Sequence, residues 1–114
     1  MMLKPSIREV TIQDLKQVYE IEVESFTKPY PLELFLVYYI ISKDLFIVAS
    51  YNNIVVGYAI GLIEYKNSEK LGHIISIAVR PLYRGLGIGE ILMKELERRI
   101  RKYFVTYIYL EVGV

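Results

Sequence analysis

The sequence contains no cysteine and no long apolar run. Without cysteine there is no disulfide framework, and the protein itself supplies no thiolate chemistry. The longest apolar runs, residues 34–41 and 45–49, are well short of the roughly 20 residues that a transmembrane helix needs. The first residues also lack the apolar segment of a signal peptide. We therefore expect a soluble cytoplasmic protein with no membrane partner and no metal cofactor.

A charge excess of either sign is also absent. The sequence has 14 Lys and Arg residues against 13 Asp and Glu residues, giving a formal net charge of +1. Such a chain has no strong overall electrostatic field that would attract a polyanion, so we expect no nucleic-acid partner. With 114 residues, 54% of them hydrophobic, it is large enough to bury one core and has no room for a second domain. We expect a single domain over residues 1–114.

Hydrophobic periodicity and turn residues predict an α/β fold with a mixed sheet. Thr11 and Asp14 resemble a capping box that opens the first helix, and Asn52-Asn53 is typical of a tight hairpin turn. Expected strands are residues 7–10, 45–51, 54–65, 72–79 and 106–114; expected helices are 12–26, 31–41 and 88–104, and a polar loop is expected at 66–70. The expected buried stripe of the last helix is Ile88, Ile91, Leu92, Leu96, Ile100 and Phe104. Because crossover connections are right-handed, strands 72–79 and 106–114 are expected to be parallel neighbours.

The most informative stretch is an apolar strand that stops at Pro81, followed by the glycine-rich turn Arg84-Gly85-Leu86-Gly87-Ile88-Gly89. The first N–H groups of a helix starting there have no intrahelical acceptor, which is the geometry of an anion site, and phosphate is the natural ligand. A dinucleotide fingerprint does not fit, because the glycines alternate and lie apart from the strand. A P-loop does not fit either, because no Gly-Lys-Ser/Thr follows. A purely structural tight turn remains the alternative.

The Arg-x-x-Gly-x-Gly pattern at Arg84, Gly87 and Gly89, between a strand and an amphipathic helix, resembles the acetyl-CoA-binding motif of the GNAT superfamily of N-acetyltransferases. The expected order of elements, strand-helix-helix-strand-strand-strand-helix-strand, is similar to that superfamily along the whole chain. Within it, residues 77–81 (Ile-Ala-Val-Arg-Pro) and 109–112 (Tyr-Leu-Glu-Val) resemble protein N-terminal acetyltransferases, including those that act on a ribosomal protein and their archaeal relatives.

This resemblance implies acetyl-CoA as the cosubstrate. It implies that the strand edge at residues 77–79 hydrogen-bonds the pantetheine arm and that the N–H groups of residues 85–89 hold the pyrophosphate. The last two strands would splay apart with the thioester in the gap, and the Val79 N–H would stabilise the oxyanion. The expected cofactor-binding residues are Ile77, Ala78, Val79, Arg84, Gly85, Leu86, Gly87, Ile88 and Gly89.

The candidate catalytic bases are His73, the one histidine of the chain, and Glu111. Parallel pairing of their two strands is expected to bring both to the splayed region. The resemblance supports this pair, because the matching positions in related N-terminal acetyltransferases are assigned to proton removal. An α-amino group has a pKa of about 7.7–8.0, against about 10.4 for lysine, so a modest base is sufficient. The alternatives are a hydrogen-bonded structural histidine and a solvent-facing glutamate.

The candidate substrate-binding residues are Phe26, Tyr30 and Pro31, between the first two helices. They match the loop that receives the first residues of the substrate in the enzymes that the chain resembles. Some of those enzymes carry a glutamate in this loop, whereas this chain has Lys28 nearby. The alternative is that Phe26 and Tyr30 only cover the core.

The end of the chain departs from the family pattern. Gly113 stands where the family usually has an arginine, and the sequence stops at Val114, before the usual helix with its thiolate-protonating tyrosine and the last strands. We therefore expect residues 106–114 to form an edge strand with an apolar face, which invites pairing with a second chain into a homo-oligomer.

The function expected from these residues is transfer of an acetyl group from acetyl-CoA to the α-amino group of protein or peptide N-termini, by direct attack of the amine. A fold does not determine its substrate, so a small-molecule amine or a Lys side chain remains an alternative acceptor. A catalytically weak CoA-binding interaction module is a further alternative, favoured by the missing tyrosine.

Overall fold

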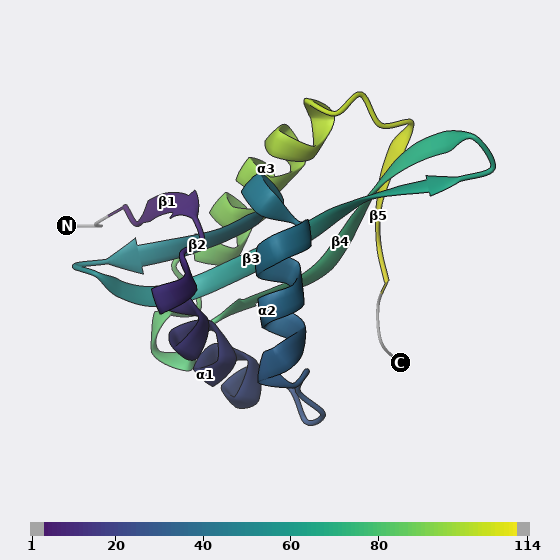
Figure 1. Cartoon of the computed structure of the whole chain (residues 1–114). Coiled ribbons are helices and arrows are strands. Elements are labelled where there is room, and N and C mark those ends of the chain that lie inside the picture. Colours follow the sequence, from purple (N-terminus) through teal and green to yellow (C-terminus); the bar gives the residue numbers. More distant parts are fainter. Residues whose placement is uncertain (1–3, 112–114) are drawn as a thin grey trace.

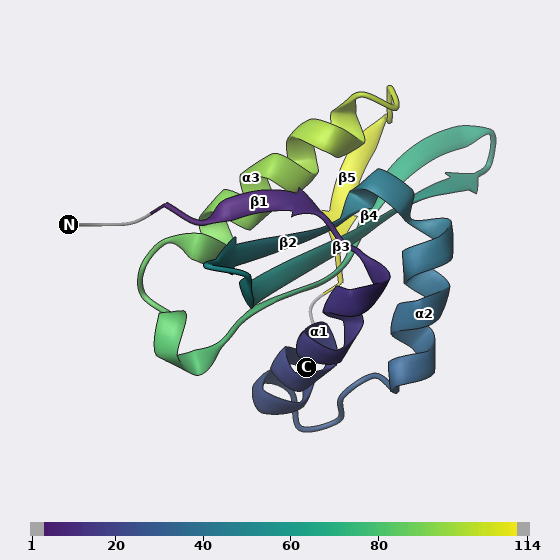
Figure 2. The ribbon, with the colours of Figure 1, turned by 60° about the vertical axis from the view of Figure 1, so that its left-hand side comes forward.

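A five-stranded sheet carries helices on both faces. The computed structural model describes residues 4–111. Its strands are β1 (Ser6–Glu9), β2 (Phe46–Tyr51), β3 (Ile54–Lys66), β4 (Glu69–Val79) and β5 (Tyr107–Leu110), and its helices are α1 (Leu15–Ser25), α2 (Leu32–Ile41) and α3 (Ile88–Arg101). Helices α1 and α2 cover one face, and α3 covers the other (Figure 1 and Figure 2). No helix within residues 4–111 is long and apolar enough to cross a membrane.

The strands lie in the sheet in the order in which they occur in the sequence. Strands β1 to β4 pair antiparallel, and β5 pairs parallel to β4, with Leu71 opposite Tyr107 and Ile74 opposite Leu110. Helix α3 forms the crossover that a parallel pair requires. The predicted α/β fold with its mixed sheet is confirmed, as is the parallel pairing of the last two strands.

Two apolar cores, one on each face, hold the layers together. The interior strand β2 is buried on both faces, so its alternate residues enter different cores. Phe46 and Val48 pack with α1 and α2, whereas Ile47 and Ala49 pack with α3. Burial of both faces explains why this strand is a continuous apolar run in the sequence.

Helix α3 lies unusually close to β4. A Cβ atom at Gly72 would lie 2.3 Å from the Cγ2 atom of Ile100, so no larger residue fits without a shift of the helix or the strand. This contact fixes the end of α3 against the start of β4. At the other end of the helix, a Cβ atom at Gly89 would lie 3.8 Å from the Cγ2 atom of Val79, so the start of α3 and the glycine-rich turn lie beside the carboxyl end of β4.

The corner between β1 and α1 contains an ion pair between Asp14, which is buried, and Arg8, whose side chain is partly exposed. The Asp14 carboxylate accepts hydrogen bonds from the Arg8 guanidinium at 2.6 and 3.0 Å and from the Thr11 backbone N–H at 2.7 Å. Burial raises the pKa of Asp14, but the bonds from Arg8 and Thr11 outweigh it and hold the pKa below its usual value. The predicted capping box is present, and it opens a short 3-10 turn (Ile12–Asp14) that leads into α1.

The prediction of a polar loop at residues 66–70 is wrong, because β3 and β4 form one long hairpin. β3 runs to Lys66, and β4 begins at Glu69 rather than at Gly72. Asn67 and Ser68 both adopt left-handed backbone conformations, with φ of 50° and 68°. Two such residues make a tight turn, so the polar residues around them continue the strand pairing.

The buried stripe predicted for α3 extends too far. Ile88, Leu92, Leu96 and Ile100 are buried. Ile91, however, is 36% exposed, the helix ends at Arg101, and Phe104 is 89% exposed. Phe104 has a left-handed φ of 57°, which turns the chain back toward β5, so Tyr103 and Val105 pack on this core instead. Of the strand predicted at 106–114, the structure has Tyr107–Leu110, and Val112 and Val114 lie outside the described residues.

Candidate active site

The carboxyl half of β4 has a free edge within the described part of the chain. Strand β5 pairs with β4 only as far as Ile74. On the other side, β3 shifts register at the same point: Gly61 lies opposite Ile74, but Ile60 lies opposite Ser76, which makes Ile75 a bulge residue. Bulges increase local twist and re-aim the residues that follow. β4 and β5 therefore part after Ile74, and residues 75–79 have no strand partner on the β5 side among residues 4–111.

A cavity of about 820 Å³ lies between this edge and the start of α3, and we call it the α3 cavity. All of the predicted cofactor-binding residues line this cavity except Leu86, which is 47% exposed. Met93, Lys94 and Glu97 of α3, which the sequence reading missed, complete its wall together with Tyr83 and Glu90. The lining residues taken from the predicted set are Ile77, Ala78, Val79, Arg84, Gly85, Gly87, Ile88 and Gly89.

The glycine-rich turn leaves space above the start of α3. Gly85 and Gly87 have left-handed φ angles of 80° and 84°, and a Cβ atom added to either would have no neighbouring atom within 4 Å. Gly87 is the N-cap of α3, so the next backbone N–H groups have no acceptor within the helix. The result is a bare backbone cradle with donors at a positive helix end, and a diphosphate fits such a cradle.

The Arg84 side chain lines the α3 cavity but is also held by protein atoms. Its Nε donates to the carbonyl of Val79 at 2.9 Å, and its Nη2 donates to the Ser25 hydroxyl at 3.1 Å. These bonds connect the turn to the end of β4 and to the last residue of α1. Arg84 therefore positions the turn, whatever it also contributes to a ligand.

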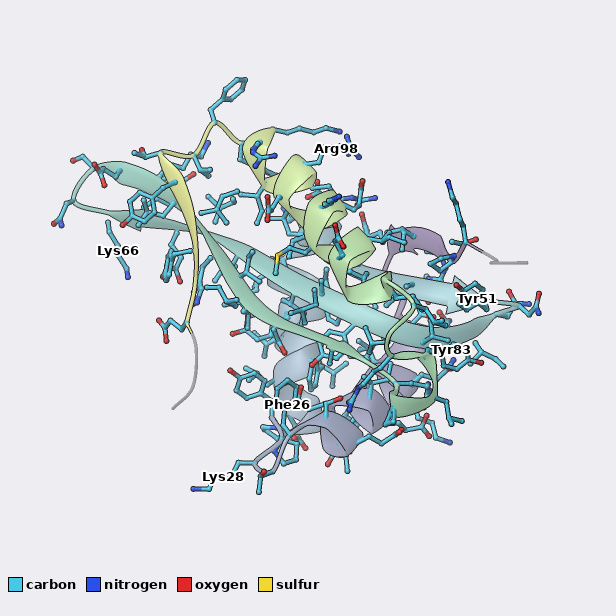
Figure 3. The ribbon with its side chains drawn as sticks, turned by 180° about the vertical axis from the view of Figure 1, so that it is seen from behind. Phe26, Lys28, Tyr51, Lys66, Tyr83 and Arg98 are labelled. Carbon is cyan, nitrogen blue, oxygen red and sulfur yellow. The ribbon has the colours of Figure 1, made fainter. Side chains whose placement is uncertain are left out.

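A second cavity, of about 510 Å³, opens on the other side of the same β4 edge, and we call it the loop cavity. Phe26 and Tyr30, from the loop between α1 and α2, line it with Glu111, whereas Pro31 does not line it and serves as the N-cap of α2. Figure 3 shows Phe26 and Lys28 on this loop, and Lys28 also lines the loop cavity. Ile77 lines both cavities, so they meet at one residue of β4.

His73 lies next to Glu111, as the expected strand pairing requires, but outside the lining of the loop cavity. The His73 Nε2 atom is 4.0 Å from Glu111 Oε1, and its Nδ1 atom is 2.9 Å from Glu64 Oε2. The His73 side chain is 14% exposed, whereas that of Glu111 is 77% exposed. Tyr109 stacks on the imidazole, with ring centroids 4.4 Å apart, and its hydroxyl donates to Glu64.

The charges of this group are set by its hydrogen bonds. The bond from Tyr109 lowers the pKa of Glu64; burial opposes this, and His73 and Lys66 add to the lowering. Donation to Glu64 raises the pKa of Tyr109. Glu64 is thus a carboxylate at neutral pH, and Tyr109 a neutral phenol.

A buried carboxylate stands at the base of the loop cavity. Glu22 of α1 is 2% exposed; it accepts a hydrogen bond from the Tyr30 backbone N–H at 2.8 Å and another from the Tyr58 hydroxyl. Tyr58 also contacts the Ser76 hydroxyl at 2.9 Å, and burial together with the bond to Glu22 raises the pKa of Tyr58. Glu22 therefore fastens the loop that carries Tyr30.

Sequence reading missed both Glu22 and Glu64. Glu22 had a signal, because an acidic residue stands in the apolar stripe of the first helix. Glu64 had none, because its position beside His73 depends on the cross-strand register in which Leu62 faces His73.

Comparison with known proteins shows the family of the chain. The model of the acetyltransferase (GNAT) family matches residues 15–114. An uncharacterized N-acetyltransferase of Methanocaldococcus jannaschii is 44% identical over 95% of this chain and 67% of its own length. An N-alpha-acetyltransferase of Sulfurisphaera tokodaii is 32% identical over 95% of this chain and 70% of its own length. The crystal structure of Ard1 from Thermoplasma volcanium superposes with a TM-score of 0.86 at 29% identity, covering 96% of this chain and 72% of that one. The chain therefore belongs to the acetyltransferase (GNAT) family.

Proposed function

We propose that the protein transfers the acetyl group of acetyl-CoA to the α-amino group of protein or peptide N-termini. The observation that supports this most directly is the pair of cavities that meet at Ile77 on the free edge of β4. One cavity has a backbone cradle for a diphosphate, and the other has an aromatic loop and two carboxylates. A relative named N-alpha-acetyltransferase supports the choice of acceptor.

In this proposal the α3 cavity holds the donor. The N–H groups of residues 85–89 bind the pyrophosphate, and the free edge at residues 77–79 binds the pantetheine arm as an added strand would. The Val79 N–H stabilises the oxyanion. Acetyl-CoA supplies the acetyl group as a thioester, whose carbonyl then lies near Ile77, where the loop cavity opens.

The loop cavity receives the acceptor in this proposal. Phe26 and Tyr30 contact the first side chain of the peptide, and Pro31 fixes the start of α2 behind them. Glu111 and His73 remove the protons that the amine loses. The amine nitrogen bonds to the carbonyl carbon, the carbon–sulfur bond breaks, and the thiolate leaves with its electron pair. No covalent enzyme intermediate is needed, because the amine is itself the nucleophile.

The test is an acetyl-transfer assay with peptides that differ in their first residue, each also made with a blocked N-terminus and an internal lysine. We expect acetyl-CoA-dependent labelling of the free α-amino group, located by mass spectrometry. Glu111→Gln and His73→Phe are expected to lower kcat by about tenfold or more, because each removes a proton acceptor.

Equal rates in wild type and both variants would remove the assignment of the two bases. Labelling only of the lysine, or only of small amines in a parallel panel, would identify a different acceptor. Tight binding of acetyl-CoA without turnover on any amine would indicate a CoA-binding interaction module.

We also propose that a second copy of the chain pairs with the outer edge of β5. Tyr107 and Leu110 on this strand are 51% and 43% exposed, and within residues 4–111 no strand lies beyond it. An exposed strand with apolar side chains is a template for pairing.

A further inference from the structure

We propose that Glu64 is a positioning residue for His73: it holds the imidazole with its proton on Nδ1 and leaves Nε2 free to accept a proton on the Glu111 side. This inference rests on the proposed function, in which His73 removes a proton from the amine. Glu64 lies on β3, away from both cavities, so neither the motif nor the cavity linings point to it.

The geometry assigns each oxygen of Glu64 a donor. The His73 Nδ1 atom lies 2.9 Å from Oε2, and the Tyr109 hydroxyl donates to Oε1. Lys66 Nζ lies 3.9 Å from the same Oε1 atom. These partners come from β3, β4 and β5, so the carboxylate connects three adjacent strands at the point where β4 and β5 begin to part.

The charge state of Glu64 determines the tautomer of His73. The hydrogen bond from Tyr109 keeps the pKa of Glu64 low, and an ionised carboxylate only accepts hydrogen bonds. The 2.9 Å contact is therefore a bond donated by Nδ1–H of His73. In the neutral ring the lone pair is then on Nε2, which lies 4.0 Å from Glu111 Oε1.

Stacking fixes the plane of the ring. The Tyr109 and His73 rings are 11° from parallel with centroids 4.4 Å apart. Because the same tyrosine is bonded to Glu64, the ring and the carboxylate are held by one side chain. A rotation of His73 that points Nε2 elsewhere breaks both the hydrogen bond and the stack.

The experiment uses the full 114-residue chain, in which His73 is the one histidine, so imidazole ¹⁵N NMR signals need no assignment. In wild type we expect the neutral ring to be protonated on Nδ1. In Glu64→Gln we expect a mixture of both tautomers, because an amide offers a donor as well as an acceptor. With the best peptide substrate, the kcat of Glu64→Gln is expected to fall by about tenfold or more, because part of the general-base contribution is lost. The KM of this variant for acetyl-CoA is expected to stay unchanged.

Glu69→Gln is the matched control, because it makes the same chemical change at an exposed position of the same hairpin, and it is expected to retain wild-type kcat. Tyr109→Phe keeps the stacked ring but removes the hydroxyl, and a smaller fall in kcat is expected.

Protonation of the wild-type His73 ring on Nε2, or equal kcat values in Glu64→Gln and Glu69→Gln, would overturn the proposal. If Glu64→Gln does not fold, the wild-type tautomer and the Tyr109→Phe rate decide. A wild-type chain that acetylates no peptide refutes the proposed function, and the tautomer then tests the role of Glu64 separately.

Discussion

Gly87 has two roles at the scale of a single residue: it adopts a left-handed conformation, and it leaves space at the N-terminus of α3. Its φ is 84°, and a side chain there would enter empty space in the α3 cavity. We predict that Gly87→Val raises the dissociation constant of coenzyme A by about tenfold or more, because loss of charge-assisted hydrogen bonds from the blocked N–H groups costs about 1.5–3 kcal/mol. Isothermal titration calorimetry of coenzyme A with wild type and Gly87→Val measures the two dissociation constants.

The control separates backbone strain from blockage of the cradle. Asn53→Val places the same side chain at another left-handed position, with φ of 68°, in the turn between β2 and β3. It carries a strain cost of about 1–2 kcal/mol but leaves the cradle open. A coenzyme A affinity in Gly87→Val equal to that in Asn53→Val would argue against a diphosphate at this helix end.

Residues with a local signature were predictable, and residues defined by register were not. Arg84, Gly87 and Gly89 follow a spacing that the turn itself requires, so the sequence located the α3 cavity. Glu64 and Tyr109 reach His73 only through cross-strand pairing, which no local pattern contains. That His73 and Glu111 lie next to each other was predictable, because the parallel pairing of the two strands follows from the crossover.

At the scale of elements, the corner between β1 and α1 depends on the Arg8–Asp14 pair. We predict that Asp14→Asn lowers the free energy of unfolding at pH 7 by about 1–3 kcal/mol, because the bonds from Arg8 and Thr11 lose a charged acceptor. Since folding lowers the pKa of Asp14, this stabilisation is present above the unfolded-state pKa of about 3.9 and is lost as the pH falls through the lower folded-state pKa.

Urea unfolding of wild type and Asp14→Asn at pH values from about 2 to about 7 measures this difference in the free energy of unfolding. The difference in the free energy of unfolding between wild type and Asp14→Asn should become smaller below about pH 4. The exposed Glu69→Gln serves as a control with little effect at either end. A gap that is constant with pH would contradict the role of the Asp14 charge.

Strands and helices were largely predictable from periodicity, but their ends were not. Strand β4 starts at Glu69 because Asn67 and Ser68 both tolerate left-handed angles, whereas polar residues alone had indicated a loop. Helix α3 ends before Phe104, although that residue continues its apolar spacing. In both places a backbone conformation decided the outcome, and composition does not reveal it.

At the scale of the whole molecule, β5 is one of the two edge strands of the sheet within residues 4–111, and no strand of that range pairs with its outer edge. We predict that the 114-residue chain self-associates, and that Tyr107→Lys shifts it toward the monomer, because a charge on an edge strand opposes pairing. Size-exclusion chromatography with light scattering measures the mass. Tyr65→Lys, at a 74% exposed position on β3, is the matched control and is expected to leave the association unchanged. A wild-type chain that is monodisperse and monomeric would contradict the prediction.

The two cavities are built differently, and this has a consequence for how such a domain diversifies. Helix α3 forms one wall of the α3 cavity and packs so closely on β4 that a single added methyl group at Gly72 would collide with Ile100. The position of this helix therefore tolerates little change. The opposite wall is a surface loop held at its base by Glu22. On the proposed assignment, substitutions in the loop alter which amine is accepted, while the donor site keeps its shape.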